Sequence, residues 1–171
     1  ETFVFFYADN GAFMLPGRGL EVATNAPLRD GGVTCFEGGL RVAALARWAG
    51  GIASGSTIDE PLWSPDLLVA CCRLAGAEPP ADRKIDGRDP LPTLTNGAPS
   101  PHESLFFRYV KHAALRRGDW KIVRTRPSEP WQLFDLANDV GESHDLAAAE
   151  PERVEALNAD FARWVRDVDG E

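Results

Sequence analysis

The segment from Thr2 to Ala8 (TFVFFYA) constrains the fold of this chain more than any other. It is a continuous, mostly aromatic and β-branched run, which is typical of a strand covered on both faces in a parallel sheet. It ends abruptly in the turn-forming residues Asp9, Asn10 and Gly11. Because the strand pattern starts at the second residue, with no Met or capping turn before it, we expect the chain to begin inside a larger structure.

Length and composition narrow the class of protein. The 171 residues correspond to about one domain of roughly 150 residues, and 44% of them are hydrophobic, which is enough for a packed core. The 18 Lys and Arg residues against 26 Asp and Glu give a net charge of -8, which argues against nucleic acid or an anionic membrane surface as partner. No apolar run approaches the roughly 18 residues of a membrane span, and the first residues lack the pattern of an export signal.

The cysteines indicate no disulfide framework. There are three, and Cys71 and Cys72 are adjacent, so neither paired bridges nor a CxxC metal or redox site is expected. We therefore expect Cys35, Cys71 and Cys72 to be small buried apolar residues.

The first hundred residues predict a mixture of strand, loop and helix. After a long glycine-rich loop over residues 11–39, residues 41–48 (RVAALARW) favour a second strand, although a helix fits the periodicity as well. Ser64 and Pro65 are good helix-start residues and Gly76 a good stop, with Leu67, Cys71 and Leu74 as the apolar stripe. Residues 78–101 contain six prolines and are expected to be mostly extended.

The last part of the chain predicts a small antiparallel sheet and a helix. Four short strands are expected at residues 104–110, 113–117, 120–126 and 131–136. Glu150 and Pro151 then open a final helix. Its apolar stripe, which should lie on the sheet, consists of Val154, Leu157, Phe161, Trp164, Val165 and Val168.

Asp9 and Asn10 are the sharpest candidates for a functional site. They follow the first predicted strand directly, and ligands of open α/β sheets gather at the carboxyl ends of strands. Their carboxylate and amide oxygens suit Ca²⁺ or Mg²⁺ better than zinc. The alternative is an ordinary Asx turn, since D-N-G is a common turn sequence. Two side chains cannot supply the six to eight oxygens of a Ca²⁺ site, so other ligands would have to come from elsewhere.

The loop over residues 25–42 (NAPLRDGGVTCFEGGLRV) is the second candidate region. Its glycines allow close backbone approach, and Arg29 or Arg41 could bind a sulfate or phosphate through paired hydrogen bonds. The alternative, which we favour over direct catalysis, is that Glu37 pairs with Arg41 and fixes the loop against the sheet. The chain contains no nucleophile elbow, phosphate-binding loop or H-E-x-x-H sequence.

Basic residues and histidines accumulate in the segment that precedes the acidic tail. The histidines at positions 102, 112 and 144 follow no metal-ligand spacing, so ordinary hydrogen-bonding roles are expected. The basic residues could face an anion, but a solvated strand face is the commoner explanation. Those between residues 101 and 126 are Arg108, Lys111, Arg116, Arg117, Lys121, Arg124 and Arg126.

An ordered series of segments resembles the C-terminal part of the sulfatase family, the arylsulfatase-like enzymes of the alkaline phosphatase superfamily. The matching stretches, which together span nearly the whole chain, are FVFFYADNG, NAPLRDGGVTCFEGGLRV, RWAG, IDEPLWSPDLL, RLAGAEPP, IDGRDPLPTL, ALRRGDWKIVR, WQLFDLANDVGE and DLA. The resemblance implies the C-terminal part of an alkaline-phosphatase-like α/β domain in residues 1–103. In residues 104–171 it implies a small antiparallel sheet packed on a C-terminal helix.

The resemblance also implies a function. Asp9 and Asn10 would be two ligands of the active-site cation, Ca²⁺ or Mg²⁺, and the substrate would be a sulfate ester of a small molecule or glycan. The family's nucleophile is a formylglycine made within a C-x-P-S-R type motif, which neither Cys35 nor Cys71 matches. We therefore expect the nucleophile outside this chain and no turnover by the chain alone. Family members are often periplasmic, secreted or lysosomal.

One position departs from the family pattern. The loop after P-L-R commonly reads G-G-K-G-T, with a lysine that binds the sulfate group, whereas here Gly32 stands at the lysine position. A cation that neutralises developing charge is worth several kcal/mol of barrier. Arg29 could substitute for it as a substrate-binding residue. Otherwise the protein is a non-catalytic, sulfatase-derived module that binds an anionic ligand or partner, or a phosphoester hydrolase of the same superfamily.

Overall fold

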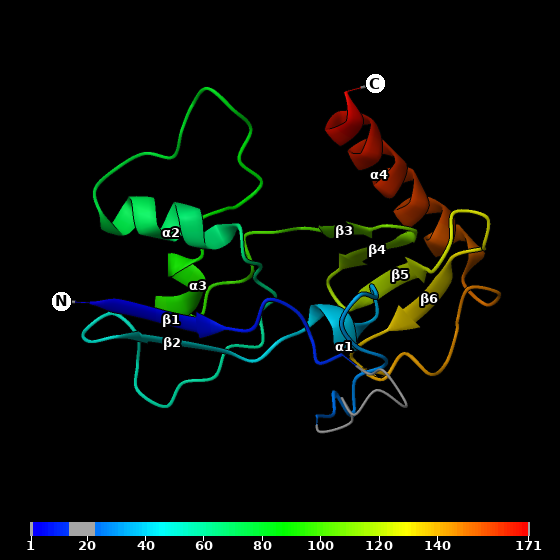
Figure 1. The fold of residues 1–171 in the computed structure, drawn as a ribbon, viewed down its shortest axis with the longest axis horizontal. Coiled ribbons are helices and arrows are strands. Elements are labelled where there is room, and N and C mark those ends of the chain that lie inside the picture. Colours follow the sequence, from blue (N-terminus) through cyan, green and yellow to red (C-terminus); the bar gives the residue numbers. More distant parts are fainter. Residues whose placement is uncertain (1, 14–22, 171) are drawn as a thin grey trace. The chain divides into compact units, whose positions relative to one another are not determined.

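The computed structural model describes residues 2–13 and 23–170, and these residues form two compact units (Figure 1). One unit comprises Glu1–Phe6 with Leu45–Glu103, and the other comprises Tyr7–Ala44 with Ser104–Glu171. The chain passes from one unit to the other between Glu103 and Ser104, which is the domain boundary expected from the sequence. The segment Tyr7–Ala44, however, groups with the C-terminal sheet. Part of the predicted loop over residues 11–39, including Pro16, lies outside the described residues.

The C-terminal sheet has four antiparallel strands in sequence order, as the sequence predicted. They are β3 (Leu105–Tyr109), β4 (His112–Arg117), β5 (Trp120–Arg124) and β6 (Gln132–Asp135). Gly118 makes the tight turn between β4 and β5 with φ of 57°, a conformation that costs glycine little. The order follows from short connections, because antiparallel neighbours need only a tight turn.

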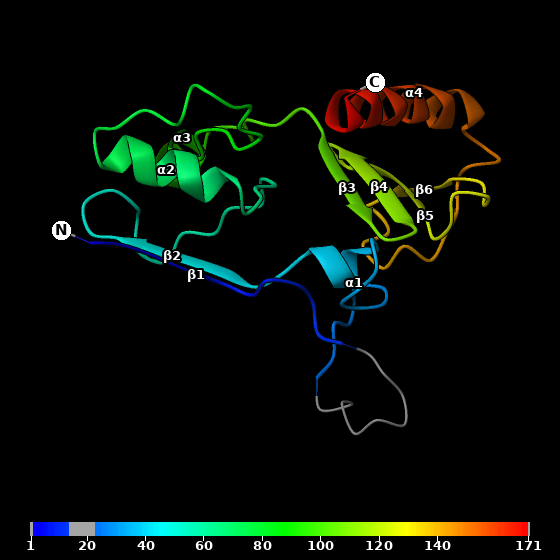
Figure 2. The same cartoon turned by 45° about the horizontal axis from the view of Figure 1, so that its top comes forward.

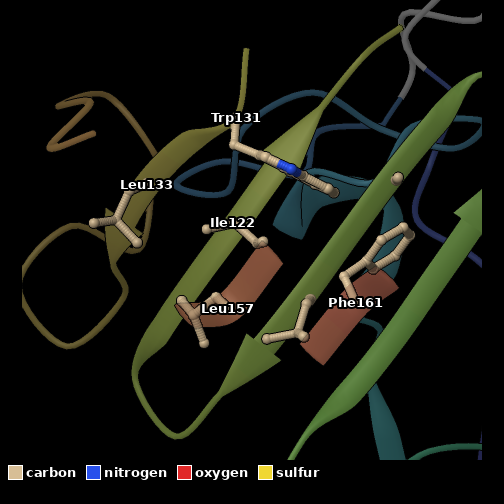
Figure 3. Packing of buried hydrophobic residues seen from close by; sticks show 7 residues of the cluster. Ile122, Trp131, Leu133, Leu157 and Phe161 are labelled. Carbon is tan, nitrogen blue, oxygen red and sulfur yellow. The ribbon is translucent and has the colours of Figure 1, made fainter. Parts of the chain in front are cut away.

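Helix α4 (Pro151–Asp169) covers one face of this sheet. Its buried residues Leu157 and Phe161 pack against Leu115, Ile122 and other apolar side chains of the strands (Figure 3). The helix begins with a proline in its first turn and ends at Gly170, which has the left-handed conformation. Both are common residues at helix ends. The predicted helix and its contact with the sheet are confirmed.

The short helix α1 (Glu37–Leu40) and the residues before it cover the opposite face of the sheet (Figure 2). Cys35 and Phe36 are buried there against Ala114, Val123 and Phe134. Alternate residues of each strand thus serve two cores, one under α4 and one under α1. No local pattern predicted this second cover, because the covering segment and the strands are far apart along the chain.

Strands β1 (Phe3–Tyr7) and β2 (Ala44–Trp48) form a separate two-stranded sheet. The Ala8 N–H donates to the Ala43 carbonyl at one end of the pair, and the Phe3 ring packs on Trp48 at the other, so the strands run in opposite directions. The strand predicted over residues 41–48 is confirmed in a shorter form. Strand β2 is therefore not the parallel neighbour that was expected for the first strand, because it runs antiparallel to β1.

Burial of β1 on both faces was the wrong expectation for this chain. Phe6 is 65% exposed, and Val4 and Leu45 are also exposed. The physical reason is that β2 is the one strand paired with β1 among the described residues. A two-stranded sheet leaves most of its side chains in water unless another layer covers it.

Two helices complete the chain between residues 45 and 103. Helix α2 (Asp66–Leu74) is the predicted one, but its N-terminus is not capped by Ser64, and its buried face is Asp66, Val69 and Ala70. The expected stripe was therefore displaced, and Cys71 is exposed rather than buried. Helix α3 (Leu91–Asn96) lies in the stretch expected to be extended.

Candidate metal site and the loop that supports it

Asp9 and Asn10 follow β1 directly, as the sequence predicted. Asp9 is exposed and Asn10 half-buried, and the backbone N–H of Asn10 donates to Asp9 Oδ1 at 3.0 Å. This bond orients the carboxylate toward the start of the following turn. Both interpretations of the pair, an Asx-type turn and a cation site, are compatible with it.

The glycine-rich loop lies directly against Asn10. A Cβ atom at position 32 would lie 2.8 Å from Asn10 Oδ1 and 2.8 Å from the carbonyl oxygen of Gly11, so a side chain cannot enter here without displacing one of them. The Gly32 N–H donates to the Ala12 carbonyl at 3.1 Å. The close backbone approach expected of the loop glycines is confirmed, and Gly32 sits beside the candidate ligand.

Asn25 ties the two halves of this region together. Its Oδ1 accepts the Ala12 N–H at 2.9 Å, and its Nδ2 donates to the carbonyls of Ala12 and Asp30 at 2.8 and 2.9 Å. One amide side chain therefore satisfies three backbone groups of the two segments. Asn25 was not among the predicted site residues, although an Asn at the start of a proline- and glycine-rich loop is a common sign of such a role.

A buried ionic cluster fastens the loop to the C-terminal sheet. The fully buried Lys121 ammonium lies 2.8 Å from Glu37 Oε1 and 2.8 Å from Glu142 Oε1. The Glu37 N–H also donates to Glu142 Oε2 at 2.6 Å, and Arg116 Nη1 lies 3.5 Å from Glu37 Oε2. Burial raises the pKa of Glu142, and the positive charge of Lys121 opposes this shift.

This cluster corrects two expectations from the sequence. Glu37 does fix the loop, but its partners are Lys121 and Arg116 from the sheet, while Arg41 is exposed. Lys121 was expected on a solvated strand face, yet it is fully buried because α1 covers that face of β5. The contact partners come from strands far along the chain, so no local spacing could have indicated them.

Arg29 lies against the same cluster. Its Nη1 donates to the Glu142 carbonyl at 2.8 Å, and its guanidinium stacks 3.9 Å from the centre of the Phe36 ring. These contacts give Arg29 a structural function in holding the loop. Its substrate-binding role stays a prediction.

The described residues supply part of a metal site. Within residues 2–13 and 23–170, no three His, Cys, Asp or Glu side chains gather closely enough to hold a metal. The neighbouring oxygens of Asp9 and Asn10 match a hard cation in kind, and they cover part of its coordination number. The Ca²⁺ or Mg²⁺ expectation therefore remains a prediction that concerns these two residues.

The histidines and cysteines have distinct surroundings. His102 Nε2 lies 2.7 Å from Asp66 Oδ1, and both side chains are buried, whereas His144 is exposed beside Asp139. Burial raises the pKa of the Cys35 thiol to about 11, although Lys121 lowers it. A buried thiol that holds its proton is unsuited to nucleophilic chemistry, so the expected packing role of Cys35 is confirmed.

Curated proteins of known name match most of the sequence. The chain is 36% identical over 139 residues to N-acetylgalactosamine-6-sulfatase of Mus musculus, covering 81% of the chain and 26% of that protein. It is 34% identical over 195 residues to steryl-sulfatase of Mus musculus (93% and 31%) and 37% identical over 190 residues to arylsulfatase A of Homo sapiens (92% and 36%). The chain thus spans about a quarter to a third of the length of these relatives. No family model matches the sequence.

Solved structures share the fold. The crystal structure of Ps i-CgsB in complex with k-i-k-neocarrahexaose superimposes with a TM-score of 0.83 at 28% identity, covering 95% of this chain and 36% of that one. PsFucS1 sulfatase from Pseudoalteromonas sp. has the same fold, with a TM-score of 0.77 at 20% identity over 95% of this chain and 36% of that one.

These likenesses define the class of protein first: part of an alkaline-phosphatase-like α/β fold, with a small antiparallel sheet packed on a helix. The chain belongs to the sulfatase family. Its coverage of the relatives is consistent with the C-terminal portion that the sequence motifs indicated. No helix among the described residues is long and apolar enough to cross a membrane.

Proposed function

We propose that this chain is the C-terminal part of a metal-dependent hydrolase that cleaves sulfate esters, and that it contributes two of the metal ligands. The observation that carries this proposal is the position of Asp9 and Asn10 in a sulfatase-family chain, at a strand end against which the 25–42 loop packs. Oxygen ligands at the end of a strand suit Ca²⁺ or Mg²⁺.

The residues of this chain would then act mainly by positioning. Asp9 and Asn10 would hold the cation, which when bound polarises the sulfate group and stabilises charge on its oxygens. Asn25 and Gly32 fix the backbone around Asn10. The cluster around Lys121 anchors the same loop to the sheet, so that the ligand oxygens keep their place when a substrate binds.

The substrate class follows from the relatives. The relatives include sulfatases named for a sulfated sugar and for steryl substrates, and one similar structure holds a neocarrahexaose. We propose a sulfate ester of a glycan or small molecule, with the formylglycine nucleophile outside these 171 residues and an exported or lysosomal location. The purified chain alone should therefore not hydrolyse an aryl sulfate above the rate of its Asp9→Ala variant.

The metal ligands can be tested in the full-length protein, because Asp9 and Asn10 supply only part of the coordination of a Ca²⁺ ion. We expect Ca²⁺ to raise the melting temperature, because a ligand at 100 times its Kd stabilises the folded state by about 2.7 kcal/mol. Asp9→Asn should abolish this rise while keeping the shape of the side chain. Asp59→Asn, at an exposed acid distant in sequence, is the matched control and should retain it. An equal calcium response in wild type and Asp9→Asn would overturn the ligand assignment.

Gly32 favours one alternative function, a non-catalytic module that binds an anionic ligand. Glycine stands at the position of a sulfate-binding lysine in the family pattern, and a side chain there would meet Asn10. The two functions differ in the full-length protein. Hydrolysis of an aryl sulfate that is lost with Asp9→Asn supports the enzyme, whereas binding of the same ester without turnover supports the module.

A further inference from the structure

An open cavity of about 390 Å³ lies at the end of the C-terminal sheet, within the unit that also contains Asp9 and Asn10. Its size is in the range of small-molecule sites. Its walls come from the end of β3, the turn into β4, the residues after β5 and the glycine-rich loop. The lining residues that matter for its chemistry are Val33, Tyr109, Lys111, His112, Thr125 and Arg126.

The cavity has the composition of an anion site. Lys111 is exposed, and no acidic side chain pairs with it in the part of the chain that the structure describes. Within residues 2–13 and 23–170, the one acidic side chain that pairs with Arg126 is Glu129, at 3.8 Å, and this solvent-exposed pair is weak. His112 Nδ1 is buried with no hydrogen-bond partner among the described residues. Two cationic residues, Lys111 and Arg126, and one histidine, His112, therefore line the same opening.

The same wall also suits a sugar. Tyr109 is half-exposed, so its ring offers a flat apolar surface beside the cations. A ligand that combines an apolar ring face with a sulfate or carboxylate would use both features. A simple inorganic anion would use only the charges.

Consecutive residues of one loop contact the candidate metal site and line the cavity. Gly32 packs on Asn10 Oδ1, and the next residue, Val33, lines the cavity. Val33 has φ of 72°, an unfavourable conformation for a β-branched residue, so the surrounding contacts hold this loop in place. Gly32 and Val33 thus bring the candidate metal site and the cavity onto consecutive residues of one loop.

We infer that this cavity is a subsite for a second anionic group, a sulfate or a carboxylate, carried by the glycan whose sulfate ester occupies the metal site. The inference rests on the proposed function. A substrate with two anionic groups should be bound more tightly than one with a single group.

Calorimetry on the full-length protein with Ca²⁺ tests the subsite. The probes are galactose 6-sulfate, galactose 2,6-disulfate, and a disaccharide that joins galactose 6-sulfate to glucuronic acid. We expect at least one doubly charged probe to bind about tenfold more tightly than the singly charged one, a difference typical of a charge-assisted contact. The double variant Lys111→Gln/Arg126→Gln should remove this advantage. Tighter binding of the disulfate indicates that the subsite accepts a sulfate, and tighter binding of the disaccharide indicates that it accepts a carboxylate.

Arg163→Gln is the matched control, since Arg163 lies on α4, is exposed and pairs with Asp160. Loss of the advantage in the double variant alone supports the subsite. The inference is overturned if wild type shows no advantage, if the double variant keeps it, or if Arg163→Gln loses it as well. Asp9→Asn separates the two proposals: a failed metal assignment leaves all affinities unchanged in this variant, whereas a failed subsite shows no advantage in any protein.

Discussion

The more hydrophobic of the two sheets in this chain is the less buried one. Strand β1 reads FVFFY, yet Val4 and Phe6 are exposed, whereas β4 reads HAALRR and buries Ala113, Ala114 and Leu115. The four-stranded sheet has α4 on one face and the α1 segment on the other, while the β1–β2 pair has no third strand among the described residues. Burial is therefore decided by the layers available to a strand, and the two regions should respond differently to substitution.

The largest difference should come from Lys121. Changing Lys121→Gln removes the cation that lies between Glu37 and Glu142, leaving two buried carboxylates without their main partner. Breaking a buried ion pair from one side costs about 3–5 kcal/mol, and we expect a loss of this size in the free energy of unfolding of the C-terminal sheet. Urea unfolding followed by tryptophan fluorescence measures it.

Arg41→Gln is the control for this substitution. Arg41 is exposed on the same loop, and its side chain has no ion-pair partner in the described chain, so the substitution should change the unfolding free energy by less than about 0.5 kcal/mol. Equal losses in the two variants would mean that the loop is not held by the buried cluster.

Truncation of one apolar side chain in each sheet compares the two regions directly. Leu115→Ala opens a cavity in the fully buried core under α4 and should cost about 2–5 kcal/mol. Phe6→Ala removes a ring that is 65% exposed, so the change should stay within about 0.5 kcal/mol. It should also reduce aggregation of the chain in light scattering, because an exposed apolar strand is an association surface. A large stability loss from Phe6→Ala would show that something covers β1.

The sequence predicted those parts of the fold that depend on local patterns. The four short strands, the turn at Gly118 and the helix from Pro151 are set by alternation, turn residues and helix boundaries within a few positions. Helix α3 was missed because six prolines in residues 78–101 favour extended chain, although a proline in the first turn is compatible with a helix.

The sequence predicted the candidate ligands Asp9 and Asn10 but not the residues that support them. Asp9 and Asn10 stand out because their position after a strand is a local signal. The support around them is not local: Asn25 bonds to Ala12, and Glu37 reaches Lys121 across 84 positions. Pairings over such separations depend on which face of the sheet the loop covers, and neither charge spacing nor periodicity contains that information.

A smaller effect than those of Lys121→Gln and Leu115→Ala is expected from Cys35, and it distinguishes the covered sheet from the exposed helix surface. Burial raises the pKa of its thiol to about 11 from an ordinary value of 9.0. Below about pH 8 the thiol is protonated in both the folded and the unfolded state, so it contributes no pH dependence there. Between pH 9 and 11 the unfolded chain releases the proton while the folded chain keeps it, and stability falls with rising pH.

The expected loss is about 1.4 kcal/mol by pH 10, since one pKa unit corresponds to that free energy. It is measured as the difference in the pH dependence of urea unfolding between wild type and Cys35→Ala, which lacks the titrating group. Cys71→Ala should keep the wild-type dependence, because Cys71 is exposed on α2. If removing Cys35 leaves the slope between pH 9 and 11 unchanged, its thiol reaches solvent, and the face of the sheet under α1 is less well covered than the face under α4.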